Sequence, residues 1–187
     1  PDKVLEYWKS FKQVRVGASI DGFGKVLEYQ RYPIKWEQAK KNLDKLDLFC
    51  QENENIMAWV AFTVTVSNIW HLPEFMQWKV ASSGWKKINS TKKRPVITHH
   101  VAHGPKRANI RLLTPKLKED LEKFYNGWKK IYEGEFSELQ TEKACKILDS
   151  VLQYCKSEDY SSEIDSFVKF TKYLDKARGQ NILDVVP

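Results

Sequence analysis

Small polar residues follow the first strand that the sequence predicts, and their types are suited to ligand binding. Ser19, Asp21, Gly22 and Gly24 come directly after this strand. The glycines let the backbone approach a ligand closely, and the Ser19 hydroxyl can both donate and accept a hydrogen bond. The alternative is a tight turn in which Asp21 caps the backbone locally. In parallel α/β folds ligands bind at the carboxyl ends of strands, which is where these residues lie.

A second polar group ends the next predicted strand, and an arginine lies between the two groups. Thr65, Ser67 and Asn68 form the second group, for which the simplest alternative is that Asn68 caps a following helix. Arg31 carries a fork-shaped guanidinium that suits a carboxylate or a phosphate, with a surface salt bridge as the alternative. The two loops together predict a ligand-binding edge.

The histidines and cysteines lack the spacing of a metal site. His99 and His103 stand four residues apart, which suits a metal only on a helix, whereas this segment is predicted to be strand and loop. Cys50, Cys145 and Cys155 are an odd number at wide spacings, which argues against a disulfide framework and against a cysteine-based metal site made by this chain alone. We therefore predict no metal ligands in this chain and a reducing compartment.

Three stretches with strand character must position these groups. Residues 14–20 alternate apolar and polar side chains, and residues 56–66 are nearly continuous in apolar and β-branched residues, as in a parallel strand covered on both faces. A third strand is expected at residues 95–102. Helical periodicity marks residues 2–11 before the first strand and residues 36–50 before the second, and the residues between the first strand and Pro33 are expected to be loop. This alternation predicts an α/β fold with a parallel sheet.

The last part of the chain is predicted to be helical. A short extended piece is expected at residues 108–113, and helical periodicity dominates afterwards, at residues 115–132, 136–154 and 162–178. Aromatic residues recur every four positions in the first of these helices, as in a core stripe: Phe124, Trp128 and Tyr132. We divide the chain into residues 1–113 and a helical segment, residues 114–187, that packs on the sheet.

Basic side chains are concentrated in the middle of the chain. The 187 residues carry a formal net charge of +7, and Lys and Arg outnumber Asp and Glu fourteen to three at residues 79–130. Such a region can attract a phosphate-rich or acidic partner, with Lys92, Lys93 and Arg94 as candidate contacts. One functional hypothesis is therefore a standalone binding module for nucleic acid or another anionic partner. The alternative is an ordinary solvated surface.

Hydropathy and the first residues of the chain bear on its location. No apolar run approaches the roughly 20 residues of a membrane span, and the start lacks the pattern of a signal peptide. We predict a cytoplasmic protein without a membrane partner. Because the chain begins at Pro1 and not at Met, we also expect it to be a piece of a longer protein.

Four segments of the sequence resemble parts of one enzyme family. VRVGASIDGFGKVLEYQRYPIKWEQAKKNLDKL resembles the fourth strand, its loop and the following helix of radical SAM enzymes, especially those with a SPASM or twitch domain. FTVTVSNIWHLPEFMQW resembles their fifth strand and helix. ANIRLLTPKLKEDL is similar to the segment after their sixth strand. FVKFTKYLDKARGQNILDVVP is similar to the closing tail of twitch-type members. The resemblance covers nearly the whole chain and is weakest at residues 79–107.

The resemblance implies a fold and a chemistry. The fold would be the C-terminal half of a partial (βα) TIM-like barrel with parallel strands, followed by the helical segment. In this family a [4Fe-4S] cluster reduces S-adenosylmethionine, which is cleaved to methionine and a 5′-deoxyadenosyl radical that abstracts hydrogen from the substrate. The cofactor-binding residues implied here are Ser19, Asp21, Gly22, Arg31, Val66 and Asn68.

The resemblance also implies roles for several of these positions. Ser19 would contact the methionyl or ribose end of S-adenosylmethionine, and Arg31 would pair with its methionyl carboxylate. Val66 and Asn68 would lie beside the adenosine. Asp21 would act mainly as a turn former. These roles are physically reasonable, because a carboxylate needs a cation as its partner and the face of an adenine ring can pack against the apolar end of a strand.

One part of the family pattern is absent from this sequence. The Cys-x-x-x-Cys-x-x-Cys loop that holds the cluster is missing, as is the glycine-rich second strand. Cys50, Cys145 and Cys155 cannot replace the loop, because a [4Fe-4S] cluster needs closely spaced thiolates. We therefore expect the cluster ligands in a missing N-terminal half of the barrel, which would be the partner of this chain. The chain alone is predicted to be inactive, and the expected substrate is a peptide or a small molecule.

Overall fold

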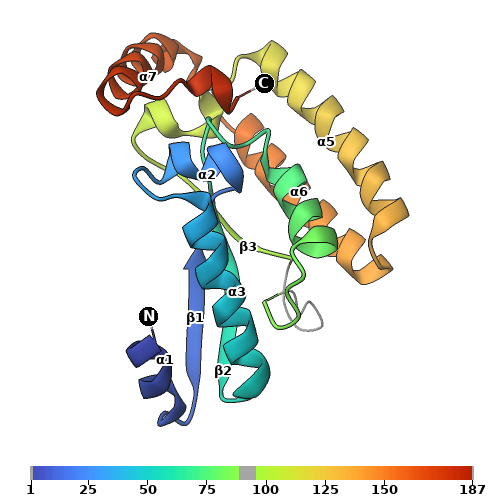
Figure 1. Ribbon diagram of the computed structural model, residues 1–187. Helices are drawn as coiled ribbons and strands as arrows, with labels where there is room; N and C mark the ends of the chain where they lie inside the picture. The colour runs from blue at the N-terminus through green and yellow to red at the C-terminus, as the bar shows by residue number, and fades with distance from the viewer. Residues whose placement is uncertain (1, 89–95, 187) are drawn as a thin grey trace.

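The computed structural model describes residues 2–88 and 96–186, and these residues are organised around a three-stranded sheet (Figure 1). Strands β1 (Val14–Ser19), β2 (Ile56–Val64) and β3 (Thr98–Val101) are all parallel and lie in the order β1-β2-β3. The predicted α/β class with a parallel sheet is therefore confirmed.

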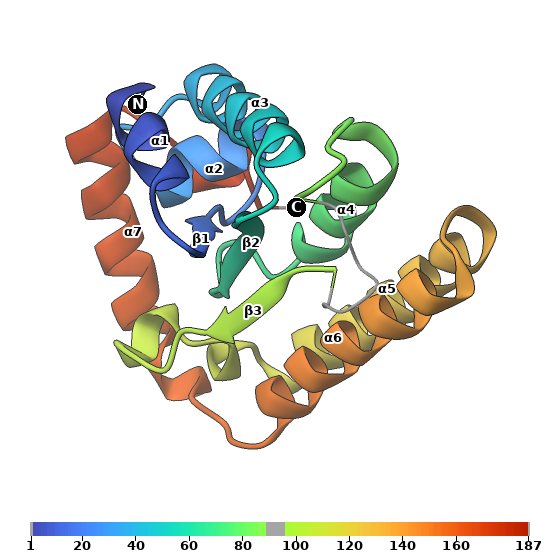
Figure 2. The same cartoon turned by 90° about the horizontal axis from the view of Figure 1, so that it is seen from below.

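Helices lie before and between the strands. Helix α1 (Asp2–Lys9) precedes β1, and α2 (Gly24–Gln30) and α3 (Trp36–Glu52) connect β1 to β2. Helix α4 (Leu72–Gln77) follows β2 and continues into a π-helical turn (Trp78–Ser82). α3 buries Leu43, Leu46, Phe49 and Cys50, at the spacing of one helical face. Figure 2 shows α3, α4 and α6 on the same side of the strands.

The carboxy-terminal part consists of helices joined by short turns. After two 3₁₀ turns (Lys106–Ala108 and Ile110–Leu112) come α5 (Pro115–Glu135), α6 (Glu138–Lys156), α7 (Ile164–Arg178) and a last 3₁₀ turn (Ile182–Asp184). Thr114 caps α5 through its hydroxyl, and Pro115 occupies the first turn, so α5 begins where its sequence predicts. The buried tyrosines Tyr125 and Tyr132 donate hydrogen bonds to the carbonyls of Ile69 and Pro73, which fix α5 against α4 and the segment before it.

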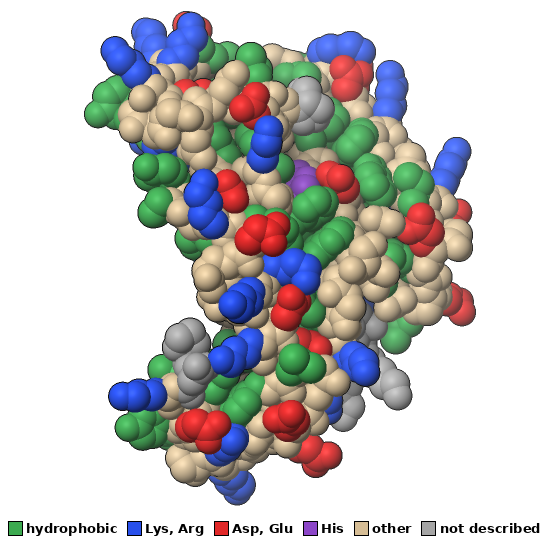
Figure 3. Space-filling view, in the orientation of Figure 1, with side chains coloured by type: hydrophobic (Ala, Val, Ile, Leu, Met, Phe, Trp, Pro, Cys, Tyr) green, Lys and Arg blue, Asp and Glu red, His purple; other side chains and the backbone are tan. Residues whose placement is uncertain are grey.

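The two faces of the sheet differ in burial. On one face Ala58, Val60 and Phe62 are fully buried in the core. On the other face Gly17 of β1 is exposed and its partner Trp59 of β2 is only half-buried. Helix α7 lies across the end of the sheet at which the strands finish (Figure 1), so the second face is left open between α1 and α7. The space-filling view shows a hollow on this side of the molecule (Figure 3).

Two local predictions were wrong. Residues 24–30, which were expected to be loop, form α2, a short helix that the sequence does not signal because Phe23 at its N-cap makes no side-chain capping bond. Residues 108–113, expected to be extended, form 3₁₀ turns, because the Asn109 side chain accepts the backbone N–H of Arg111. None of the helices in the described residues is both long and apolar enough to cross a membrane.

Candidate functional site

Asp21 joins the loop after β1 to β2. Its Oδ1 accepts the backbone N–H of Thr63 at 2.7 Å, and its Oδ2 accepts Nε of Arg31 at 2.8 Å. Asp21 is buried, whereas Arg31 is partly exposed. The structure therefore pairs two of the predicted site residues with each other, which orients the guanidinium at the carboxyl end of the sheet.

Asn68 is fully engaged within the protein and does not cap a helix. Its amide nitrogen donates to the carbonyls of Asp21 and Thr63 at 3.1 and 2.9 Å, and its carbonyl accepts the backbone N–H of Thr65 at 2.7 Å. Helix α4 begins at Leu72, so the capping alternative was wrong. Because Asn68 is 1% exposed, its amide serves to tie the ends of β1 and β2 together.

Gly22 and Ser19 lie in different surroundings. Gly22 has a φ of +150°, and a Cβ atom there would lie 2.8 Å from Val26 Cγ1 and 3.0 Å from His71 Cδ2. The atoms that closely approach Gly22 are thus side-chain atoms of the protein itself. Ser19 ends β1 with an exposed side chain on the open face of the sheet.

A pocket of about 300 Å³ lies at the carboxyl end of β2, beneath α7. Val66 lines it with the neighbouring Thr65 and Ser67, whereas the other five predicted residues do not. Gln30, at the end of α2, donates to Ser67 Oγ at 2.8 Å, and Thr65 Oγ1 lies 3.1 Å from the same oxygen. The remaining lining residues are Tyr29, Pro105, Arg107, Ala108, Phe167, Phe170, Thr171, Leu174, Arg178 and Ile182.

Helix α7 is fastened over this pocket by polar and aromatic contacts. The Tyr29 hydroxyl donates to Asp175 at 2.9 Å, and burial raises the pKa of Tyr29, so the hydroxyl keeps its proton. Arg107 stacks on Phe170, with its guanidinium carbon 4.1 Å from the ring centroid, and its buried Nε has no hydrogen-bond partner among the described residues. The pocket thus has an aromatic wall and a cationic rim.

Sequence reasoning missed most of this pocket. Gln30 and Arg107 carry no motif signal, and the pocket-lining residues of α7 resemble an ordinary amphipathic helix in sequence. Gln30 directly precedes Arg31, so its position near the ends of the strands was the signal that could have identified it as a site residue. For α7 no local pattern distinguishes the side that covers the pocket.

The described histidines and cysteines do not form a metal centre. His99 and His100 are neighbours on β3 and therefore point to opposite faces, and burial lowers the pKa of His99. His103 Nδ1 lies 3.0 Å from the Tyr154 hydroxyl. No group of three or more His, Cys, Asp or Glu side chains suited to a metal ion occurs in residues 2–88 and 96–186.

Much of the basic region at residues 79–130 is used inside the fold. Lys79 and Lys118 are buried, and their ammonium groups donate to the carbonyls of Ile88 and Glu158. Arg111 lies 4.0 Å from the Tyr154 ring centroid and pairs with Glu158 at 2.8 Å. The predicted contacts Lys92, Lys93 and Arg94 lie outside the described residues. Within the described part of the chain, no observation favours the nucleic-acid hypothesis.

Comparison with models of protein families, with curated proteins and with solved structures finds no match to this chain.

Proposed function

We propose that this chain is the S-adenosylmethionine-binding, C-terminal half of a radical SAM enzyme of the SPASM or twitch type. One observation carries the proposal: residues from all four resembling segments line the pocket beneath α7. They include Tyr29 from the first segment, Val66 from the second, Ala108 from the third and Arg178 from the fourth. Segments that are far apart in the sequence thus line one cavity at the ends of the strands. Cofactors of α/β folds bind at this end of the sheet.

The groups around this pocket fit the parts of S-adenosylmethionine. The apolar surface at Val66 and the aromatic ring of Phe170 suit a purine face, and the hydroxyls of Thr65 and Ser67 suit a ribose. Asp21 holds Arg31 through Nε among the hydrogen bonds described for the guanidinium, and in this proposal the two terminal nitrogens of Arg31 would pair with the methionyl carboxylate. Asp21 and Asn68 act as positioning residues in this proposal.

The cluster does not fit the residues of this chain. Cys50 and Cys155 are buried and Cys145 is half-buried, and the described residues offer no group of metal ligands. In the proposed parent enzyme a second half of the barrel would hold the cluster, which would supply the electron for radical chemistry with S-adenosylmethionine, while this chain would bind S-adenosylmethionine itself. That half would add its strands at the free edge of β1 and cover the open face of the sheet.

The proposal is tested first on the gene and then on the protein. The reading frame upstream of Pro1 is expected to encode a Cys-x-x-x-Cys-x-x-Cys loop, and a start codon directly before Pro1 would overturn the enzyme assignment. The protein encoded by the complete frame is then titrated with S-adenosylhomocysteine by calorimetry. Arg31→Met is expected to weaken binding about tenfold or more, because a charged hydrogen bond to the carboxylate is lost, whereas Lys41→Met on the exposed surface of α3 is expected to leave it unchanged.

A further inference from the structure

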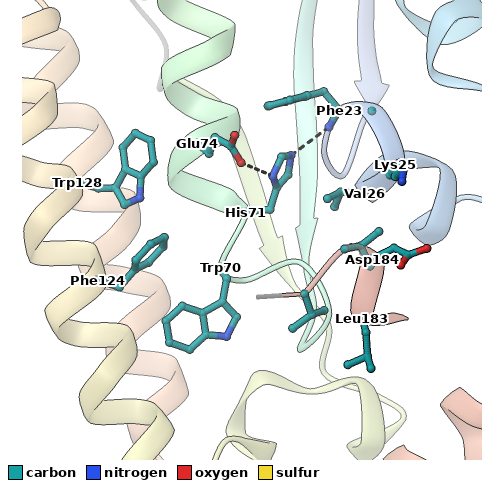
Figure 4. A pocket seen from close by; sticks show the side chains of 13 residues that line it. Phe23, Lys25, Val26, Trp70, His71, Glu74, Phe124, Trp128, Leu183 and Asp184 are labelled. Carbon is teal, nitrogen blue, oxygen red and sulfur yellow. Dashed lines mark hydrogen bonds and ion pairs between the residues drawn. The ribbon is translucent and has the colours of Figure 1, made fainter. Parts of the chain in front are cut away.

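A second pocket, of about 540 Å³, lies between α4, α5 and the carboxy-terminal tail (Figure 4). It shares no lining residue with the pocket beneath α7. The proposed S-adenosylmethionine site does not use it, so its chemistry can be considered independently. Its walls combine aromatic rings with carboxylates.

Three aromatic side chains form one wall of this pocket. Trp70 precedes α4, and Phe124 and Trp128 lie one turn apart on α5. The ring centroids of Trp70 and Phe124 are 5.3 Å apart at 60°, and those of Phe124 and Trp128 are 6.3 Å apart at 75°. Figure 4 shows Phe124 and Trp128 projecting from α5 toward the pocket, and all three rings remain partly exposed. Mutually inclined rings partly enclose a volume, unlike a flat stacked layer.

The core stripe predicted on α5 is therefore divided in the structure. Tyr132 is fully buried, as expected of a core residue, whereas Phe124 and Trp128 pack against the core and also face the pocket. Partly exposed aromatic faces retain the capacity to contact a ligand.

A hydrogen bond from His71 holds the Glu74 carboxylate beside this wall. Nε2 of His71 accepts the backbone N–H of Phe23 at 3.2 Å, so the proton of the neutral imidazole is on Nδ1, which donates to Glu74 Oε2 at 2.9 Å. Burial lowers the pKa of His71 and outweighs the opposing effect of Glu74. At neutral pH His71 is therefore uncharged, and its hydrogen bond to the Glu74 carboxylate brings no positive charge to the pocket.

The other charged residues that line the pocket decide the charge on its aromatic side. Asp184 contributes a second carboxylate, and Lys25 is the one lining cation among the described residues. In Figure 4 Lys25 and Asp184 lie on the far side of His71 from Phe124 and Trp128, whereas Glu74 lies between His71 and these rings. The side of the pocket with the aromatic rings is thus negative.

We propose that this pocket binds an alkylammonium group, with Trp70, Phe124 and Trp128 around the cation and Glu74 as its counter-ion. The faces of aromatic rings attract cations, tryptophan most strongly, and a nearby carboxylate adds a direct charge interaction. An anionic ligand beside the aromatic rings is disfavoured because Glu74 would repel it. A small quaternary amine and a methylated lysine side chain of a peptide present the same chemistry.

The first experiment separates recognition of charge from recognition of shape. The protein is titrated with choline and with 3,3-dimethyl-1-butanol, a neutral compound of the same shape, while the indole N–H signals are followed by NMR. Saturable binding of choline that shifts the signals of Trp70 and Trp128, with weaker binding of the neutral compound, is the expected result. A peptide carrying trimethyl-lysine forms a third arm, and tighter binding of this peptide than of choline would identify a protein ligand. Equal binding of the neutral compound, or saturable binding by neither cation, would overturn the proposal.

Two variants with matched controls test the residues. Trp128→Leu and Glu74→Gln are each expected to weaken cation binding by about fivefold or more. Tyr173→Leu and Glu133→Gln remove the same kinds of group from exposed positions that line neither pocket, and they are expected to change nothing. If Trp128→Leu does not fold, as judged by circular dichroism, Glu74→Gln decides, since the Glu74 side chain is 51% exposed. Unchanged affinity in folded Glu74→Gln would overturn the role of Glu74 and with it the proposal.

Discussion

Arg31 and Asp21 form an ion pair at the carboxyl end of β1, with Nε 2.8 Å from Oδ2. The other oxygen of the same carboxylate accepts the backbone N–H of Thr63 in β2. One side chain therefore both extends the pairing of the two strands and orients a guanidinium at the mouth of the sheet. These two roles are separable because they use different oxygens.

Replacing Asp21 is expected to destabilise the fold more than replacing Arg31. Asp21→Ala removes the acceptor of the Thr63 N–H and should lower the free energy of unfolding by about 2–3 kcal/mol. Arg31→Met leaves that hydrogen bond in place but leaves the buried Asp21 carboxylate without its cation, which should cost about 1 kcal/mol or more and still less than the loss in Asp21→Ala. Urea denaturation of both variants measures the difference. Equal losses would contradict the separation of roles.

Alanine is expected to be tolerated at one glycine and not at another. Gly22 has a φ of +150°, and an added Cβ would meet Val26 at 2.8 Å, so Gly22→Ala should lower the free energy of unfolding by about 1–3 kcal/mol. Gly127 lies within α5, where an added Cβ meets no atom within 4 Å, so Gly127→Ala should raise stability by up to about 1 kcal/mol. Thermal and urea unfolding provide the comparison, and a Gly22→Ala variant as stable as the wild type would refute the steric argument.

Lys79 is expected to make stability depend on pH. Burial lowers the pKa of Lys79 to about 7, although the charge of Asp47 opposes the shift. The unfolded chain therefore binds one more proton than the folded protein between about pH 7 and the ordinary lysine pKa of about 10.4. Across this window the free energy of unfolding should rise with pH, by at most about 1.4 kcal/mol per pH unit.

The comparison with Lys79→Met isolates this contribution. The difference in free energy of unfolding between wild type and variant, measured in urea at about pH 7 and about pH 9, should shift in favour of the wild type as the pH rises. Lys41→Met, on the exposed surface of α3, controls for the loss of one positive charge. A difference that does not change with pH would show that Lys79 is protonated equally in both states.

The three thiols are expected to resist alkylation in the folded protein. Cys50 and Cys155 are buried, and burial raises the pKa of Cys155 to about 11, so little reactive thiolate is present at neutral pH. Cys145 is half-buried, and although desolvation also raises its pKa, it should react first. Mass spectrometry after iodoacetamide treatment, with and without urea, identifies the order. Rapid native modification of Cys155 would contradict its burial.

The sequence predicted the elements whose signals are local. The apolar run at residues 56–66 became β2, and the periodic stretches at residues 115–132 and 162–178 became α5 and α7, with boundaries within a few residues. Such patterns depend on burial of one face, which repeats at a fixed period along the chain. Helix α2 escaped prediction because it is short and lacks a side-chain cap.

The candidate site was only partly predictable for a different reason. Asn68 was correctly placed at the end of β2, but its partner Asp21 is 47 residues away, and no local pattern encodes that hydrogen bond. The alternative of a surface salt bridge for Arg31 was partly right. Arg31 does form a salt bridge, but its partner Asp21 is buried and does not lie on the surface. The division of the chain near Leu113 stays a prediction, although one core cluster contains residues from both sides of it.

By itself the sequence determined the class of the fold, the positions of the strand ends and the polar character of the loops that follow them, because each of these depends on residues close together in the chain. Only the tertiary structure decided which polar groups bind one another, where α7 lies and which aromatic side chains remain open to a ligand. Those outcomes depend on contacts between distant segments, such as Arg107 with Phe170 and Trp70 with Phe124, whose energies do not exist until the chain has folded.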